Sequence, residues 1–208
     1  MIWAKEETLS RQEIEAIQLD KLQKVVARVY EKVPYYREKM DAIGMKPEDV
    51  KTLEDLKKLP FTTKQDMRDT YPFGLFAVDK SELARIHASS GTTGKPTVVG
   101  YTKNDINNWS DCVARLCMAV GVTDEDVAQI SFGYGLFTGA LGLHYGLERI
   151  GATVVPTSSG NTEKQLKFMR DFGTDTIVAT PSYCLYLAES ARERGIEFPM
   201  DSYKLKLG

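Results

Sequence analysis

Residues 127–157 have the sequence "VAQISFGYGLFTGALGLHYGLERIGATVVPT", which is an apolar run, a glycine-rich turn, a segment with helical spacing and a second apolar run. The alternation continues through a helical pattern at 162–172, the run "TIVATP" at 176–181 and a further helical pattern at 182–194. Short apolar runs that alternate with helices are typical of parallel strands covered by helices. This stretch therefore predicts an α/β fold with a largely parallel sheet flanked by helices.

The chain before this stretch has two other patterns. Apolar side chains recur at helical spacing between residues 10 and 70, where Ser10 and Glu13 fit a capping box. Two strand-like runs follow, "ARIHAS" at 84–89 and "TVVGYT" at 97–102, and a helix is expected after them. A helical region thus leads into the sheet.

We expect the domains to be an amino-terminal helical region at 1–80 and the first part of an α/β domain at 81–208. The last residues, "YKLKLG", have the pattern of a strand that is just beginning. A parallel strand needs neighbours and a following helix, so we expect an incomplete, amino-terminal piece of the architecture. Its open sheet edge favours self-association, and a homodimer is among the expected assemblies.

Composition excludes several classes of protein. The 27 basic and 29 acidic side chains nearly balance and are scattered, so we expect neither a nucleic-acid nor a membrane partner. Without an apolar signal core or a run of about 18 apolar residues, the sequence favours a cytoplasmic protein. Cys112, Cys117 and Cys184 match no zinc spacing and are expected to be buried, reduced thiols.

A glycine- and hydroxyl-rich loop lies between the two upstream strands. In "HASSGTTGKPTVVGYT", residues 87–102, glycines allow close backbone approach while hydroxyls and Lys95 offer hydrogen-bond donors. These groups suit phosphate oxygens, although composition alone leaves an ordinary hairpin open. A Walker A loop is excluded, because Ser89 stands where its first glycine is required and Pro96 follows the lysine.

The order of residues in "SSGTTGKPT" resembles the phosphate-binding motif of adenylate-forming enzymes. That motif usually continues with Lys-Gly, whereas Thr97 and Val98 stand here. Together with "LPFTTKQDMRDTYPFG" and "YGLFTGALGLHYG", the chain is similar to the amino-terminal half of the phenylacetate-CoA ligase family from about Leu19 onward. The fold implied by this resemblance is an incomplete adenylate-forming large domain, with the ATP- and acid-binding domain starting at 81.

The resemblance implies a two-step ligation in phenylacetate catabolism. An aryl acetic acid attacks the α-phosphate of ATP to give an acyl adenylate and pyrophosphate, and coenzyme A then displaces AMP. The implied catalytic residues are Lys95 and Lys64. The implied ATP phosphate-binding residues are Ser89, Ser90, Gly91, Thr92, Thr93, Gly94 and Lys95.

A second glycine-rich segment follows the run at 127–132. Gly133, Gly135 and Gly139 have the spacing G-x-G-x-x-x-G, without the acidic residue that a dinucleotide site needs about 20 residues further on. A nicotinamide site is therefore disfavoured. By the family resemblance this segment is instead the acid-binding wall, although core packing is the alternative for its aromatic residues. The implied acid-binding residues are Tyr134, Gly135, Phe137, Thr138 and Gly139.

The resemblance also implies Mg²⁺ with ATP, but no metal ligand is assigned in these residues. We interpret four acidic side chains, Asp124, Glu125, Asp126 and Glu148, as solvated surface charges. The isolated 208-residue chain is expected to be inactive, because its sheet is incomplete. A different class remains open, namely a homologue that binds a nucleotide or a partner without turnover.

Overall fold

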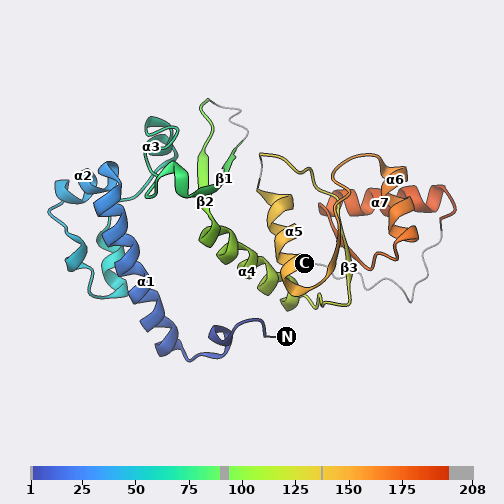
Figure 1. Ribbon diagram of the computed structural model, residues 1–208, viewed down its shortest axis with the longest axis horizontal. Helices are drawn as coiled ribbons and strands as arrows, with labels where there is room; N and C mark the ends of the chain where they lie inside the picture. Colours follow the sequence, from blue (N-terminus) through green and yellow to red (C-terminus); the bar gives the residue numbers. More distant parts are fainter. Residues whose placement is uncertain (1, 90–93, 137, 197–208) are drawn as a thin grey trace. The chain divides into compact units, whose positions relative to one another are not determined.

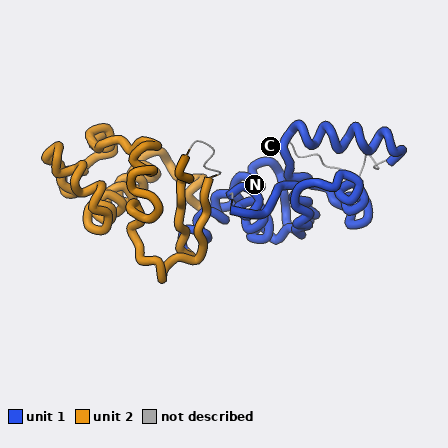
Figure 2. Tube along the Cα trace, turned by 90° about the horizontal axis from the view of Figure 1, so that it is seen from above, with its two compact units in different colours: residues 1–4, 104–208 blue, residues 5–103 orange. Residues whose placement is uncertain are grey.

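The computed structural model describes residues 2–89, 94–136 and 138–196, and Figure 1 shows their helices and strands. The chain divides into two compact units (Figure 2): residues 5–103 form one, and residues 1–4 with 104–208 form the other. The domain boundary at residue 80 stays a prediction. The run "YKLKLG" falls outside the described residues.

The unit of residues 5–103 begins with helices, as the sequence predicts. Its α-helices are α1 (Arg11–Lys32), α2 (Pro34–Ala42) and α3 (Lys64–Asp69). Its short 3₁₀ helices are η1 (Lys5–Thr8), η2 (Pro47–Asp49), η3 (Leu53–Lys58) and η4 (Lys80–Glu82). The predicted capping box is confirmed, because the Glu13 amide donates to Ser10 Oγ while the Ser10 amide donates to Glu13 Oε2.

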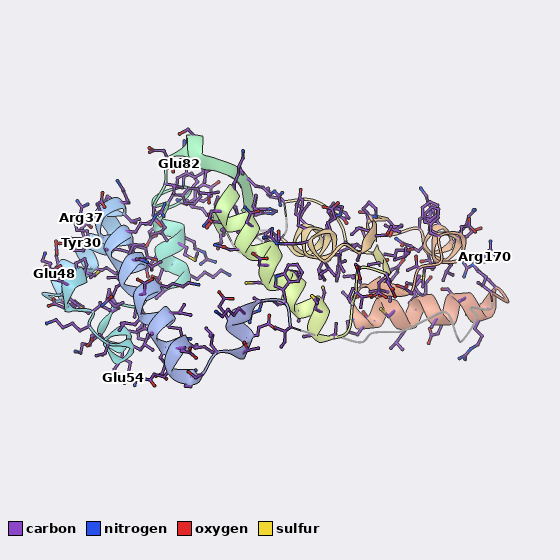
Figure 3. All side chains as sticks on the ribbon, turned by 60° about the horizontal axis from the view of Figure 1, so that its bottom comes forward. Tyr30, Arg37, Glu48, Glu54, Glu82 and Arg170 are labelled. Atoms are coloured by element: carbon purple, nitrogen blue, oxygen red, sulfur yellow. The ribbon has the colours of Figure 1, made fainter. Side chains whose placement is uncertain are left out.

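Helices α1 and α2 are joined by an apolar core and a polar contact. Val26 and Met40 are buried in one cluster. Arg37 and Tyr30, both labelled in Figure 3, meet at the surface: Arg37 Nε donates to the Tyr30 carbonyl at 2.9 Å. The Arg37 guanidinium also lies 5.8 Å from the centre of the Tyr30 ring, which is within cation–π range. These contacts fix the angle at which α2 leaves α1.

The two upstream strands form an antiparallel hairpin. Strand β1 (Leu83–Ala88) pairs with β2 (Val98–Thr102), and Ala88 lies opposite Val98 at the end nearest the connecting loop. Gly100 is required in β2, since a Cβ there would come within 2.6 Å of the Phe76 ring. The predicted strand–loop–strand arrangement is therefore correct.

The second unit contains the predicted parallel sheet. Strands β3 (Val127–Ile130), β4 (Thr153–Val155) and β5 (Thr176–Val178) lie in the order β4-β3-β5, and β3 is parallel to both neighbours. The helices are α4 (Lys103–Ala119), α5 (Gly139–Ile150), α6 (Thr162–Asp171) and α7 (Pro181–Glu193). This arrangement confirms the α/β fold class.

Successive residues of β3 face opposite sides of the sheet, because strand side chains alternate. Ala128 and Ile130 are fully buried in the cluster that contains Leu147 of α5. Gln129 points the other way, to Gln165 of α6. Helix α5 and the α6–α7 pair therefore cover opposite faces of β3 (Figure 1).

Two sequence interpretations need correction. Cys112 is exposed and Cys184 is only partly buried, so Cys117 alone fits the buried thiol that was expected. Cys112 and Cys117 lie five residues apart in α4, a rotation of roughly 140° around the helix, and thus cannot share its buried face.

None of the helices in the described ranges combines the length and apolarity needed to cross a bilayer.

Asp126 is also not a solvated surface charge, because only 4% of it is exposed. Its Oδ2 accepts hydrogen bonds from the Thr123 amide at 2.6 Å and from the Thr123 hydroxyl at 3.3 Å. A carboxylate that accepts such bonds is stabilised although it is buried. Asp126 therefore closes the turn that leads into β3.

Glycines set the distance between α4 and α5. A Cβ on Gly142 would overlap the Trp109 ring, and one on Gly146 would overlap Val113 and lie 3.1 Å from the Ala114 amide nitrogen. Because the Ala114 amide is backbone, it cannot move aside without shifting α4. Helix α5, which follows the loop after β3, is consequently held close to α4.

We expect Gly146→Ala to lower the free energy of unfolding. Overpacking costs about 1–3 kcal/mol, which exceeds the gain of up to about 1 kcal/mol from the better helix propensity of alanine. Urea unfolding followed by circular dichroism measures the change. Gly135→Ala is the control, since nothing lies within 4 Å of a Cβ at that position; an unchanged stability in Gly146→Ala would contradict the packing argument.

Candidate functional site

The base of the hairpin loop is closed by two hydrogen bonds. The Ser89 amide donates to the Thr97 carbonyl and the Thr97 amide donates to Ser89 Oγ, both at 2.9 Å. The Ser89 hydroxyl is thus engaged in holding the loop. The predicted phosphate-binding residues Ser90, Gly91, Thr92 and Thr93 lie outside the described residues.

Two of the predicted phosphate-binding residues, Gly94 and Lys95, lie in the described part of the loop just before β2. Gly94 has a φ of +134°, a conformation that disfavours any residue with a Cβ. Lys95 is exposed, and its Nζ lies 5.8 Å from the centre of the Tyr71 ring. A cation on this aromatic face stays solvated and free to turn toward an anion.

Lys64 occupies the first position of α3. The Asp66 amide donates to Thr63 Oγ1 at 3.3 Å and the Thr63 amide donates to Asp66 Oδ2 at 2.7 Å, so a capping box fixes the start of this helix. Lys64 is exposed and forms no ion pair with any described residue. The structure therefore leaves its ammonium group available, as a phosphate contact requires.

The predicted acid-binding wall is ordered by polar contacts of Tyr134. The Tyr134 hydroxyl lies 3.2 Å from His144 Nδ1, and His144 Nε2 lies 3.1 Å from Glu148 Oε1. Burial, followed by the nearby Glu148 charge, raises the pKa of Tyr134 from its ordinary value near 10 to about 12. This phenol stays protonated and keeps a hydrogen bond to His144.

The other residues predicted for the acid-binding wall differ in how far they are exposed. Gly135 is exposed with open space at its Cβ, while Thr138 and Gly139 are half-buried at the start of α5. Phe137 lies outside the described residues. The structure thus brings Tyr134 and its neighbours to the beginning of α5, as the glycine spacing indicates.

A pocket of about 450 Å³ lies at the carboxyl ends of β3, β4 and β5. It was not predicted from the sequence, since its lining comes from three separate loops and from helix α7. The rule that ligands bind at the carboxyl ends of parallel strands is the signal that would have found it. The lining residues are Ser131, Phe132, Gly133, Ser159, Gly160, Thr180, Ser182, Tyr183 and Tyr186.

One wall of this pocket is held by the buried side chain of Gln165. Gln165 Oε1 accepts from Gln129 Nε2 at 2.7 Å, from Thr157 Oγ1 at 2.7 Å and from Ser131 Oγ at 3.1 Å. Gln165 Nε2 donates to the Ser158 carbonyl at 2.7 Å. A single carboxamide therefore connects the ends of β3 and β4 to α6.

The loop between β4 and α6 needs this support, because its backbone is unusual. Ser158 and Asn161 have φ angles of 64° and 51°, in the left-handed region that non-glycine residues rarely adopt. The Lys164 amide donates to Asn161 Oδ1 at 3.0 Å and caps α6. The capped helix and Gln165 together hold Ser159 and Gly160 at the pocket.

In the described ranges no group of three or more His, Cys, Asp or Glu side chains is placed to hold a metal ion.

Comparison of the sequence with known proteins identifies its relatives, although no family model matches it. The chain is 54% identical over 202 residues to the phenylacetate-coenzyme A ligase of Escherichia coli, covering 97% of this chain and 46% of that protein. In sequence, the chain is a relative of the phenylacetate-coenzyme A ligases. The ligase of Thermus thermophilus is 53% identical and covers 91% of the chain, which corresponds to 43% of the ligase. The chain thus spans less than half the length of these ligases.

Solved structures agree with this relationship. A 2-hydroxyisobutyryl-CoA ligase in complex with 2-HIB-AMP and CoA superposes with a TM-score of 0.84 at 30% identity, covering 91% of this chain and 42% of the ligase. An open conformation of that ligase gives a TM-score of 0.83 at 29% identity. The observed helical region and parallel sheet are those of a CoA ligase fold.

We expect Gln165→Leu to lower the free energy of unfolding by about 3 kcal/mol, because each buried polar group left without a partner costs about 1–3 kcal/mol. Urea unfolding measures this loss. Lys167→Ala on the same helix is the control, since its surface pair with Asp171 contributes less than about 1 kcal/mol. Equal stabilities of the two variants would show that the carboxamide network is not needed.

The raised pKa of Tyr134 predicts a loss of stability at alkaline pH. Since the folded-state pKa lies above the unfolded value, the contribution of this group is fully present below about pH 10 and is lost as the pH rises toward about 12. Comparison of urea unfolding of the parent and of Tyr134→Phe at about pH 9 and about pH 11.5 isolates this contribution. The difference between the two proteins should depend on pH; a constant difference would contradict the assignment.

Proposed function

We propose that this sequence is part of an ATP-dependent ligase that joins an aryl acetic acid to coenzyme A. The reaction forms an acyl adenylate and pyrophosphate, after which the thiol sulfur of coenzyme A attacks the acyl carbon and AMP leaves. The identity of more than 50% to phenylacetate-coenzyme A ligases across nearly the whole chain is the observation that carries this proposal.

The local geometry of the hairpin loop supports an anion-binding role. Ser89 and Thr97 close the loop at its base, and Lys95 is exposed beside them. Both reactants of the first step, the carboxylate and ATP, are anions, so catalysis depends on positioning and on neutralising charge. In this proposal Lys95 and the loop bind the β- and γ-phosphates, and Lys64 is a second cation for the phosphates.

The acid is proposed to lie against Tyr134 and the glycines that follow it. The contact of Tyr134 with His144 fixes the ring, and the phenol itself stays protonated and neutral. Gly135, with open space around its Cβ position, leaves room for a flat group. A protonated, neutral wall suits the apolar part of an aryl acetic acid better than its carboxylate.

The test is pyrophosphate exchange into ATP by the full-length protein, which depends on added acid only if an acyl adenylate forms. We expect phenylacetate to support exchange and coenzyme A with phenylacetate to give AMP. A protein that binds ATP but shows no acid-dependent exchange with any acid would be the non-catalytic homologue instead.

Within that assay, Lys95→Ala should lower the exchange rate. Loss of one charge-assisted contact costs about 1.5–3 kcal/mol, which corresponds to roughly a 10- to 150-fold decrease. The KM for the acid should change little. Lys80→Ala is the matched control, since this exposed lysine also lies over an aromatic ring, with its Nζ 4.4 Å from the centre of the Phe73 ring. An exchange rate in Lys95→Ala equal to that of the control would remove Lys95 from the phosphate site.

A further inference from the structure

The pocket at the carboxyl ends of the strands lies where the direction of the sheet changes. From β3 the chain passes through α5 to β4 on one side, and then through α6 to β5 on the other side of β3. The loop that leaves β3 leads to α5 and the loop that leaves β5 leads to α7, and these helices cover opposite faces, so the two loops diverge. Such a switch point opens a crevice that commonly binds a ligand in α/β proteins.

The chemistry of the lining selects the kind of ligand. None of the nine described lining residues carries a charge, so a carboxylate would meet only hydroxyl and backbone donors there and no cation to offset the hydration it loses. Phe132, Tyr183 and Tyr186 contribute aromatic surface, and the ring centroids of Tyr183 and Tyr186 are 6.3 Å apart. Aromatic surface of this kind favours a neutral, flat group.

The pocket is preorganised on the side opposite to α7. Gln165 binds the Ser158 carbonyl and the Ser131 hydroxyl, so that Ser159 and Ser131 keep their places without a ligand. A preformed wall removes part of the ordering cost that binding would otherwise carry. Helix α7, by contrast, presents Tyr186, which is 52% exposed and has room to adjust its rotamer.

We propose that the aryl ring of the acid enters this pocket and that Tyr186 determines the preference for aromatic over aliphatic acids. This inference rests on the proposed ligase function and adds a second set of residues to it. Gly133 lines the pocket and directly precedes Tyr134, so the acid-binding wall continues into the pocket along the chain. In this proposal the carboxylate remains outside the aromatic part of the pocket.

The first test uses the full-length protein with Tyr186→Ala. We expect the ratio of kcat/KM for phenylacetate to that for hexanoate, measured by pyrophosphate exchange, to fall about tenfold, while the KM for ATP is unchanged. Leu185→Ala is the matched control, because this neighbouring side chain is 68% exposed and does not line the pocket. A ratio within about twofold of the parent would overturn the proposal.

A second variant makes the pocket smaller without removing an aromatic ring. A Cβ on Gly133 would lie 3.4 Å from Ser159 Oγ, an ordinary contact, so Gly133→Ala should fold normally. We expect this variant to discriminate against 4-hydroxyphenylacetate more than against phenylacetate. Equal kcat/KM losses for the two acids would contradict a ring in the pocket.

A binding measurement separates this inference from the ligase proposal. Saturation-transfer NMR with phenylacetate and no ATP should show transfer to the ring protons in the parent and in Leu185→Ala, and a clear loss in Tyr186→Ala. This result would support the pocket even if no acid supported exchange, in which case only the ligase proposal fails. Equal transfer in Tyr186→Ala and the parent would overturn the pocket, whatever the exchange assay shows.

Discussion

The carboxamide of Gln165 is the contact on which the functional end of the sheet depends. It lies in a buried position, where an unpaired polar group is costly, and it is bonded to Gln129 on the central strand and to Thr157 after β4. These bonds hold the unusual backbone at Ser158 and thereby the wall that carries Ser159. The order of the strands, the conformation of the loop and the shape of the pocket are consequently linked through one side chain.

The two faces of β3 are stabilised by different kinds of contact. Toward α5 the contacts are apolar, and Gly142 and Gly146 allow α4 to approach closely. Toward α6 the strand presents Gln129, whose amide must find a partner because it is fully buried. Apolar packing tolerates small shifts, whereas hydrogen bonds require defined distances and angles. The polar face is therefore suited to fixing loop positions, and the apolar face supplies burial of surface.

Much of the fold could be predicted, because strands and helices have local periodic patterns and capping residues such as Ser10 stand next to the helices they cap. The pocket could not, since Gly133, Ser159 and Tyr186 meet only through the order of the strands. The role of Asp126 was missed although its partner Thr123 is only three residues away, because the charge of the side chain was weighed and its local turn was not. Phosphate-loop and acid-wall residues came from motif resemblance, and their roles remain proposals even where the structure describes their surroundings.

The two ends of an aryl acetic acid require different surroundings, because the carboxylate is charged and the ring is apolar. The described residues include both exposed lysines and an uncharged, partly aromatic pocket. The carboxylate must stay reactive as a nucleophile, and desolvation in an uncharged pocket would cost several kcal/mol, on the order of the penalty for burying an unpaired ion. The ring gains free energy from burial, about 25 cal/mol for each Å² removed from water. The uncharged aromatic lining around Tyr186 suits only the second demand, while the exposed Lys95 and Lys64 are proposed to bind the phosphates that leave as pyrophosphate. A pocket that contained a cation would instead favour the carboxylate end of the acid. The absence of charge among the nine described lining residues thus favours the ring over the carboxylate in this pocket.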